Sequence, residues 1–273
     1  MPFIETKDGT HLHYNDWGSG KPVVLIHGWP LDATMWEYQS VALANAGCRV
    51  VAYDRRGFGR SAQPWTGYDY NTLSDDLAAV LEKLDLADVT LVGFSMGGGE
   101  VARYASRHGT QRLARAALVS AVTPYLLRDD SNPDGVDRSV FDQMIEGLQA
   151  DRPGFLAKFG KTFYGASLMN FAISSEFLQW SANVAMLASP KATLDCVRAF
   201  SETDFRADLP HLNIPTLIIH GDADATVPLA VSAEKAARLV PHAQLSVYSG
   251  APHGLMYTER ERLNRDLLAF MQT

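Results

Sequence analysis

A serine stands between two glycines directly after an apolar run. Residues 89–92 have the composition of a buried strand, Gly93-Phe94-Ser95-Met96-Gly97 follows, and a helical pattern begins at 98. A strand–turn–helix of this kind presents a serine hydroxyl on a sharp turn, and the turn needs glycines because side chains there would collide with neighbouring backbone. Ser95 is therefore the candidate nucleophile. The alternative is a Gly-rich loop in which Ser95 only caps the helix.

A serine hydroxyl is a weak nucleophile until a base removes its proton, so the sequence must supply one. His253 lies in Gly250-Ala251-Pro252-His253-Gly254, on a loop after the last predicted strand. His220 closes a strand and is expected to be a hydrogen-bonded histidine of the core or its rim. The other histidines fall in a hairpin, in loops or at a helix end: His11, His13, His27, His108, His211 and His242. We predict His253 as the base; the alternative is a histidine on a surface loop.

The imidazole of such a base needs a carboxylate that fixes its tautomer and stabilises its charged form. Two candidates follow the strand pattern at 216–219, Asp222 next to the strand end and Asp224 further into the loop. The sequence pattern alone leaves both open.

The negative charge that develops on a carbonyl oxygen during acyl transfer needs hydrogen-bond donors. We expect one donor to be the backbone N–H of Met96, at the start of the helix. The second is expected from His27-Gly28-Trp29-Pro30, where Trp29 has an N–H and Pro30 has none. Pro30 favours an extended Trp29, which presets this loop, and His27 is expected to brace it.

The elements that position these residues alternate between strand and helix. A hairpin is predicted at 3–14, with Asp8-Gly9 in its turn, and short apolar runs follow at 23–26, 50–53, 89–92 and 116–119. Helical patterns lie between them; one carries Thr72 and Asp75 at capping-box positions. The pattern predicts an α/β protein with a mostly parallel sheet flanked by helices. It stops near 123 and resumes near 214, which predicts a core of 1–122 and 214–273 with a helical cap at 123–213.

Composition excludes several classes of function. The 273 residues include 24 Lys+Arg and 31 Asp+Glu, a net charge of −7 that argues against a nucleic-acid or anionic-membrane surface. No apolar run is long enough to span a bilayer, and the first residues lack a signal-peptide pattern. Two distant cysteines offer neither metal-ligand spacing nor a disulfide framework. We expect a cytoplasmic protein without a metal.

One segment matches a nucleotide-binding fingerprint. Gly57-Phe58-Gly59-Arg60-Ser61-Ala62 has the G-x-G-x-x-A pattern and follows a strand. However, Arg55 and Arg56 stand between the predicted strand and the first glycine of the pattern, and residues 63–67 cannot open the required helix. We predict a turn with an exposed polar rim instead.

Taken together, these motifs resemble the α/β-hydrolase fold, and more narrowly the group of bacterial arylesterases and cofactor-free haloperoxidases (perhydrolases). The order Ser95, Asp224, His253 is the one expected of that fold. The likeness covers nearly the whole chain. The segments that carry it are Asp16-Trp17-Gly18-Ser19-Gly20, His27-Gly28-Trp29-Pro30, Asp54-Arg55-Arg56-Gly57-Phe58-Gly59-Arg60-Ser61, Gly93-Phe94-Ser95-Met96-Gly97-Gly98-Gly99-Glu100, Phe200-Ser201-Glu202-Thr203-Asp204-Phe205 and His220-Gly221-Asp222-Ala223-Asp224.

The resemblance implies further properties. The second Asp of the G-D-x-D segment, Asp224, is the acid in the family; relatives lack metal and haem and are often trimers or hexamers. The substrate pocket would be lined by Trp29, Pro30, Val122, Met144, Phe159, Phe163, Phe200, Thr226, Val227 and Leu229. By residue pattern alone, most of these positions would simply be cap core.

The leading hypothesis is a serine esterase of small esters, aryl acetates among them, which works through an acyl-enzyme. Hydrogen peroxide in place of water would add perhydrolase (metal-free haloperoxidase) activity. Lactonase or amidase activity on the same residues, and a non-catalytic ligand-binding protein, are the alternatives.

Overall fold

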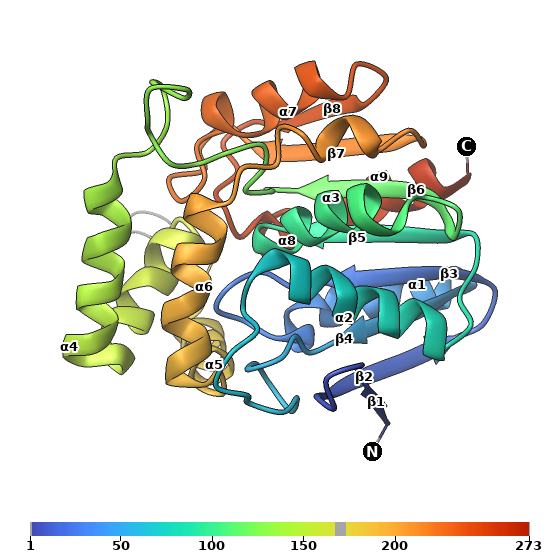
Figure 1. Cartoon of the computed structure of the whole chain (residues 1–273), viewed down its shortest axis with the longest axis horizontal. Helices are drawn as coiled ribbons and strands as arrows, with labels where there is room; N and C mark the ends of the chain where they lie inside the picture. The colour runs from blue at the N-terminus through green and yellow to red at the C-terminus, as the bar shows by residue number, and fades with distance from the viewer. Residues whose placement is uncertain (1, 167–172, 273) are drawn as a thin grey trace.

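The computed structural model describes residues 2–166 and 173–272 and contains one eight-stranded sheet, in the order β1-β2-β4-β3-β5-β6-β7-β8 (Figure 1). β1 and β2 form an antiparallel hairpin, β2 pairs antiparallel with β4, and β3 to β8 pair in parallel. The strands are β1 Phe3–Glu5, β2 His11–Gly18, β3 Lys21–Ile26, β4 Cys48–Tyr53, β5 Val89–Phe94, β6 Leu113–Val119, β7 Thr216–Gly221 and β8 Gln244–Tyr248.

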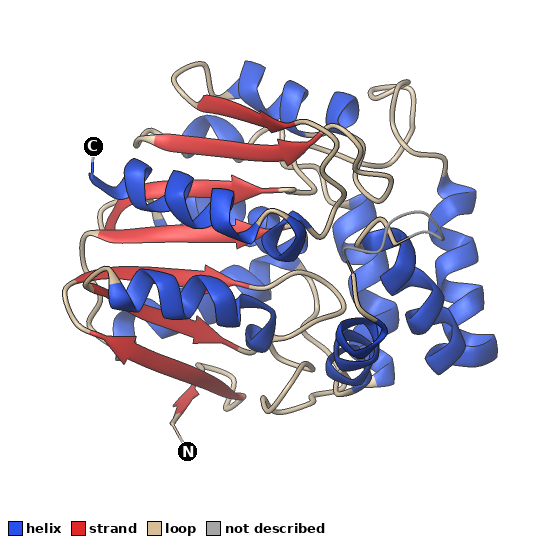
Figure 2. Ribbon diagram, turned by 180° about the vertical axis from the view of Figure 1, so that it is seen from behind, coloured by secondary structure: helices blue, strands red, loops and turns tan. Residues whose placement is uncertain are grey.

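Helices cover both faces of this sheet. α1 and α9 pack together on one face, and α2, α3 and α7 lie on the other (Figures 1 and 2). The helices are α1 Glu37–Asn45, α2 Tyr70–Lys83, α3 Met96–His108, α4 Arg138–Phe163, α5 Ser175–Met186, α6 Pro190–Glu202, α7 Ala233–Leu239, α8 Leu255–Thr258 and α9 Arg260–Gln272, with 3-10 helices η1 Ala33–Trp36, η2 Leu209–His211 and η3 Leu229–Val231. Among the described residues, no helix is long and apolar enough to cross a membrane.

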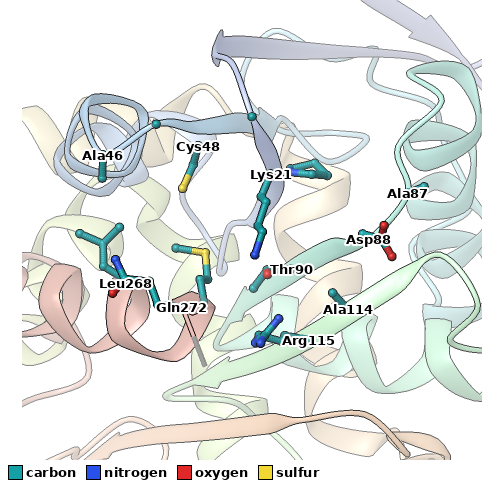
Figure 3. Close-up of a pocket in the computed structure, with 14 residues that line it drawn as sticks. Lys21, Ala46, Cys48, Ala87, Asp88, Thr90, Ala114, Arg115, Leu268 and Gln272 are labelled. Carbon is teal, nitrogen blue, oxygen red and sulfur yellow. The ribbon is translucent and has the colours of Figure 1, made fainter.

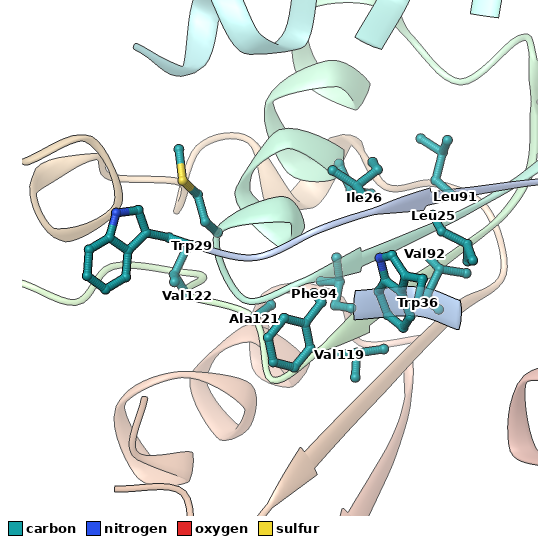
Figure 4. Packing of buried hydrophobic residues seen from close by; sticks show 14 of the residues in the cluster. Leu25, Ile26, Trp29, Trp36, Leu91, Val92, Phe94, Val119, Ala121 and Val122 are labelled. Carbon is teal, nitrogen blue, oxygen red and sulfur yellow. The ribbon is translucent and has the colours of Figure 1, made fainter. Parts of the chain in front are cut away.

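The core lies between sheet and helices. Every residue of β5 is buried, as expected for a central parallel strand with helices on both faces. Trp36 packs edge to face against Phe94, with ring centroids 6.1 Å apart (Figure 4). Such aromatic pairs add about 1 kcal/mol beyond the area that they bury. This packing holds the end of β5, and with it Ser95, in a fixed position.

Helices α4, α5 and α6 lie together beyond the carboxyl ends of the parallel strands, where the active residues of such sheets gather (Figures 1 and 2). Their N-caps are Asp137, Ser174 and Ser189, whose side chains accept hydrogen bonds from first-turn N–H groups. They fall inside the predicted cap, of which residues 167–172 lie outside the described part of the chain. The predicted boundaries of this cap stay a prediction.

One local prediction needs correction. α2 begins at Tyr70 with Asp69 as its cap, because the Asp69 carboxylate accepts hydrogen bonds from the N–H groups of Asn71 and Thr72; the predicted capping pair therefore lies inside the helix. The segment 57–62 forms a turn as predicted, with Arg60 exposed at its rim and Phe58 fully buried.

Candidate active site

Ser95 lies in the tight turn between β5 and α3. Its φ of 51° is in the region that non-glycine residues rarely adopt, and its side chain makes no capping hydrogen bond. A Cβ at Gly93 would lie 2.5 Å from the Gly97 carbonyl oxygen, and one at Gly97 would lie 2.6 Å from that of Ile26. The flanking glycines are therefore required by the turn. The alternative role for Ser95, a helix cap, is not what this geometry provides.

His253 reaches Ser95 from the loop after β8. Its Nε2 lies 2.9 Å from Ser95 Oγ, within hydrogen-bond distance. The ring is 1% exposed and packs against Phe94 and Phe163, with centroids 5.0 and 4.8 Å away. His253 is thus a buried histidine rather than a surface one.

Asp224 lies on the far side of the imidazole. Its Oδ2 is 2.6 Å from His253 Nδ1, and its Oδ1 accepts hydrogen bonds from the Thr226 and Val227 N–H groups at 2.9 and 2.8 Å. Asp222 is exposed and accepts instead from the Gly250 N–H at 2.6 Å. Geometry therefore separates the two carboxylates that the sequence pattern left open.

The charge on Asp224 is stabilised by its neighbours. Burial alone would raise the pKa of this carboxyl, but the adjacent His253 and the hydrogen bond from His220 outweigh burial and lower the pKa. The carboxylate is therefore ionised beside the His253 ring. That is the state needed to stabilise an imidazolium.

His220 has a part in this site that the sequence did not indicate. Its Nε2 lies 2.8 Å from the Val227 carbonyl oxygen and 3.3 Å from Asp224 Oδ2. Because that carbonyl can only accept, Nε2 carries the proton. Nδ1 is buried without a partner among the described residues. The four-residue spacing to Asp224 is the only sequence signal that could have suggested this contact.

The two predicted N–H donors lie at the expected elements. Met96 is the first residue of α3, where an N–H has no acceptor inside the helix. Trp29 is buried, follows β3, and within the described chain no residue accepts a hydrogen bond from its N–H. Its indole Nε1 donates to the Thr193 carbonyl at 3.0 Å, and the Trp29–Pro30 peptide bond is cis.

His27 braces the loop that carries Trp29. Its Nε2 accepts from the Arg55 N–H at 2.9 Å, and Arg55 in turn pairs with the buried Glu100 of α3. Burial, together with the nearby Arg55 charge, lowers the pKa of His27 well below its usual value. A neutral His27 is therefore available as an acceptor.

A cavity of about 40 Å³ opens beside Ser95 and His253. Six of the predicted pocket residues line it together with Trp29: Val122, Met144, Phe159, Phe200, Thr226 and Val227. Pro30 and Phe163 line a smaller neighbouring cavity, of which Phe159 also forms a wall. Leu229 lies in η3 and lines neither. The sequence missed Leu126, Val136, Val140 and Phe141, which complete the first cavity.

This arrangement can perform acyl transfer. A hydroxyl faces a base, the base is oriented by a carboxylate, and two N–H groups are predicted to face the same apolar cavity. Among residues 2–166 and 173–272, no group of three or more His, Cys, Asp or Glu side chains could hold a metal ion.

Comparison with known proteins agrees with this geometry. A family model described as the alpha/beta hydrolase fold matches residues 21–259. A non-heme chloroperoxidase from Kitasatospora aureofaciens is 44% identical over 273 residues, 99% of this chain and 99% of the relative. A bifunctional esterase/perhydrolase from Acinetobacter calcoaceticus is 42% identical over 277 residues, covering 100% of each. The crystal structure of a bromoperoxidase from Bacillus anthracis superposes with a TM-score of 0.96 at 47% identity, covering 100% of this chain and 99% of the other.

Proposed function

The chain belongs to the α/β-hydrolase fold family, in the group of non-heme haloperoxidases and esterase/perhydrolases, and on that premise we propose that it is a serine hydrolase of small carboxylic esters, aryl esters among them. The observation that carries the proposal is the continuous hydrogen-bonded path from Ser95 Oγ through His253 to Asp224. Its three members are each at most 6% exposed, so the path is built into the fold.

The proposed reaction has two halves. Ser95 Oγ attacks the ester carbonyl while His253 Nε2 takes its proton, and Asp224 stabilises the imidazolium. The Met96 and Trp29 N–H groups stabilise the oxyanion of the tetrahedral intermediate. His253 then gives the proton to the leaving alcohol, and the acyl-enzyme remains. Water attacks this ester with His253 as base, which releases the carboxylic acid and restores Ser95.

The cavity supports small, apolar acyl and alcohol groups. Its walls are mostly aliphatic and aromatic, and Phe159 and Phe200 both pack against Trp29 at centroid distances of 5.2 and 5.7 Å. Part of the wall comes from residues 123–213, which we treat as a cap over the core. The apolar walls suit the acyl and aryl groups of aryl acetates.

A second activity follows from the same intermediate. Hydrogen peroxide that attacks the acyl-enzyme in place of water would release a peracid, and a peracid oxidises halide without further help from the protein. The names of two relatives, a non-heme chloroperoxidase and a bifunctional esterase/perhydrolase, support this assignment.

Covalent labelling tests the proposal. The purified protein would be treated with diethyl p-nitrophenyl phosphate, which phosphorylates activated serines, and digested for mass spectrometry. We expect one added diethylphosphoryl group, on Ser95, together with loss of p-nitrophenyl acetate hydrolysis and of peracid formation from acetate and peroxide. Full activity after stoichiometric labelling of Ser95, or labelling at another serine with loss of activity, would refute the proposal.

A further inference from the structure

A cavity at the opposite edge of the sheet from Ser95 is larger than the two cavities near Ser95. It has a volume of about 830 Å³ and is formed where β3, β4, β5 and β6 begin and α9 ends (Figure 3). We call it the amino-edge groove. Lys21, Thr90 and Arg115 supply polar groups to it, and Leu268 and Met271 supply apolar ones.

Sheet register places the polar groups on one face. Thr90 of β5 pairs with Arg115 of β6 on one side and with Val23 of β3 on the other. Lys21 stands two residues before Val23, so its side chain leaves the strand on the same face. Figure 3 shows Lys21 pointing toward Thr90, with Arg115 on the other side of that hydroxyl. Lys21 of β3 and Arg115 of β6 therefore flank the Thr90 hydroxyl from the two strands on either side of β5.

The two cations have no acidic partner among the described residues, and the Arg115 guanidinium lies over the Phe270 ring, 6.0 Å from the ring centroid. No carboxylate of the described residues forms an ion pair with Lys21 or Arg115, and Arg115 Nε is buried without a hydrogen-bond partner. Thr90 is 5% exposed, and no described residue bonds to its hydroxyl. An unpartnered buried donor is costly in a folded protein unless a ligand or water satisfies it.

The described residues that line the groove carry a net positive charge. Asp88 is exposed at its rim and contributes one negative charge against the two cations. Burial raises the pKa of the Cys48 thiol despite the opposing effect of Lys21, so Cys48 contributes none. One side of the groove is apolar, because Leu268 and Met271 of α9 line it.

We propose that the amino-edge groove is a second binding site, for a small organic carboxylate held between Lys21 and Arg115. The planar guanidinium and the ammonium bind the carboxylate oxygens, and the Thr90 hydroxyl donates a further hydrogen bond. The apolar body of the ligand lies against Leu268 and Met271. The rim carboxylate of Asp88 disfavours dianions, so a carboxylate is preferred over inorganic phosphate.

Methionine-methyl NMR separates this site from the Ser95 cavity, since Met271 lines the groove and Met144 lines the cavity. The full chain with ¹³C-methyl methionine would be titrated with benzoate at constant ionic strength, and resonances would be assigned with Met271→Leu and Met144→Leu. We expect the Met271 signal to shift and saturate with benzoate but not with benzamide, its neutral isostere, and to respond at least tenfold more weakly to phosphate.

Matched variants complete the test. Lys21→Gln/Arg115→Gln should weaken the Met271 response to benzoate at least tenfold while p-nitrophenyl acetate hydrolysis stays unchanged. Lys83→Gln/Arg265→Gln, with the same charge change outside the groove, should respond like the parent. If the first pair does not fold, the exposed Lys21→Gln alone should weaken binding at least threefold. The proposal is wrong if only Met144 responds, if benzamide shifts Met271 equally, or if the folded groove variant binds like the parent.

Discussion

The Nε2 atom of His253 lies 2.9 Å from the Oγ atom of Ser95, although 158 positions separate the two residues in the chain. β5 ends at Phe94, directly before Ser95, and the loop after β8 carries His253 to this serine past the ends of β7 and β6. Phe94 and Phe163 pack against the imidazole and hold it at that distance. The proposed nucleophile and base are therefore positioned before any substrate binds.

Ser95→Ala should remove ester hydrolysis and peracid formation together, because both proposed reactions pass through the Ser95 acyl-enzyme. The small side chain leaves the turn intact, so circular dichroism and the unfolding midpoint should stay near those of the parent. Turnover of p-nitrophenyl acetate would be measured on protein purified to exclude contaminating esterases. Substantial turnover by the variant would remove Ser95 from the mechanism.

Asp224→Asn should lower kcat by about four orders of magnitude, as loss of the orienting carboxylate does in Ser-His-Asp enzymes. Asn keeps an oxygen for the Thr226 and Val227 N–H groups but no longer fixes the His253 tautomer. Asp222→Asn is the matched control, since Asp222 only accepts from the Gly250 N–H at the surface. If Asp222→Asn lowered kcat more than Asp224→Asn, the acid that orients His253 would be Asp222 instead.

His220→Leu should lower kcat about tenfold or more with a smaller change in KM, since a hydrogen bond to a charged group is worth about 1.5–3 kcal/mol. The variant removes the donor to the Val227 carbonyl and to Asp224. His220→Gln offers an N–H at a similar position and should restore most of kcat. Equal losses in both variants would indicate that the imidazole only fills space.

Much of the fold and of the candidate site could be predicted because the signals are local. Gly93 and Gly97 mark the turn around Ser95, and Asp224 and His253 each follow an apolar strand. The cavity wall formed by Leu126, Val136, Val140 and Phe141 could not be predicted, because it depends on how the chain after β6 and the first turn of α4 pack back over the sheet. The contact between His220 and Asp224 likewise depends on the fold of the loop after β7.

The contribution of Asp224 to stability should depend on pH in a defined direction. Its pKa in the folded protein lies below the ordinary value of 3.8, so the unfolded chain binds more protons as pH falls. Stability from this carboxylate is thus fully present above that value and is lost as pH falls toward the folded pKa. Urea unfolding of the parent and of Asp224→Asn should show a free-energy gap that narrows from pH 6 to pH 3. A gap that widens over this range would mean that burial, rather than the nearby His253, sets the pKa of the Asp224 carboxyl.

Phe159→Ala should shift specificity toward longer acyl or alcohol groups. Phe159 forms a wall of both the cavity beside Ser95 and the neighbouring cavity that Pro30 and Phe163 line, so its removal joins the two. Each methylene that then leaves water gains about 0.8 kcal/mol, so p-nitrophenyl hexanoate should improve about tenfold in kcat/KM relative to the butanoate.

The matched control for this change is Phe155→Ala. Phe155 stacks on Phe159 with centroids 6.1 Å apart but lines neither cavity. It should therefore lose a similar amount of aromatic packing without opening space next to Ser95, and the ratio of kcat/KM values for hexanoate and butanoate should stay that of the parent. Both variants would be assayed well below their unfolding temperatures, because truncation of a packed Phe costs up to about 3–5 kcal/mol. If the ratio changes equally in both, loosening of α4, rather than the joining of two cavities, controls the chain length that the site accepts.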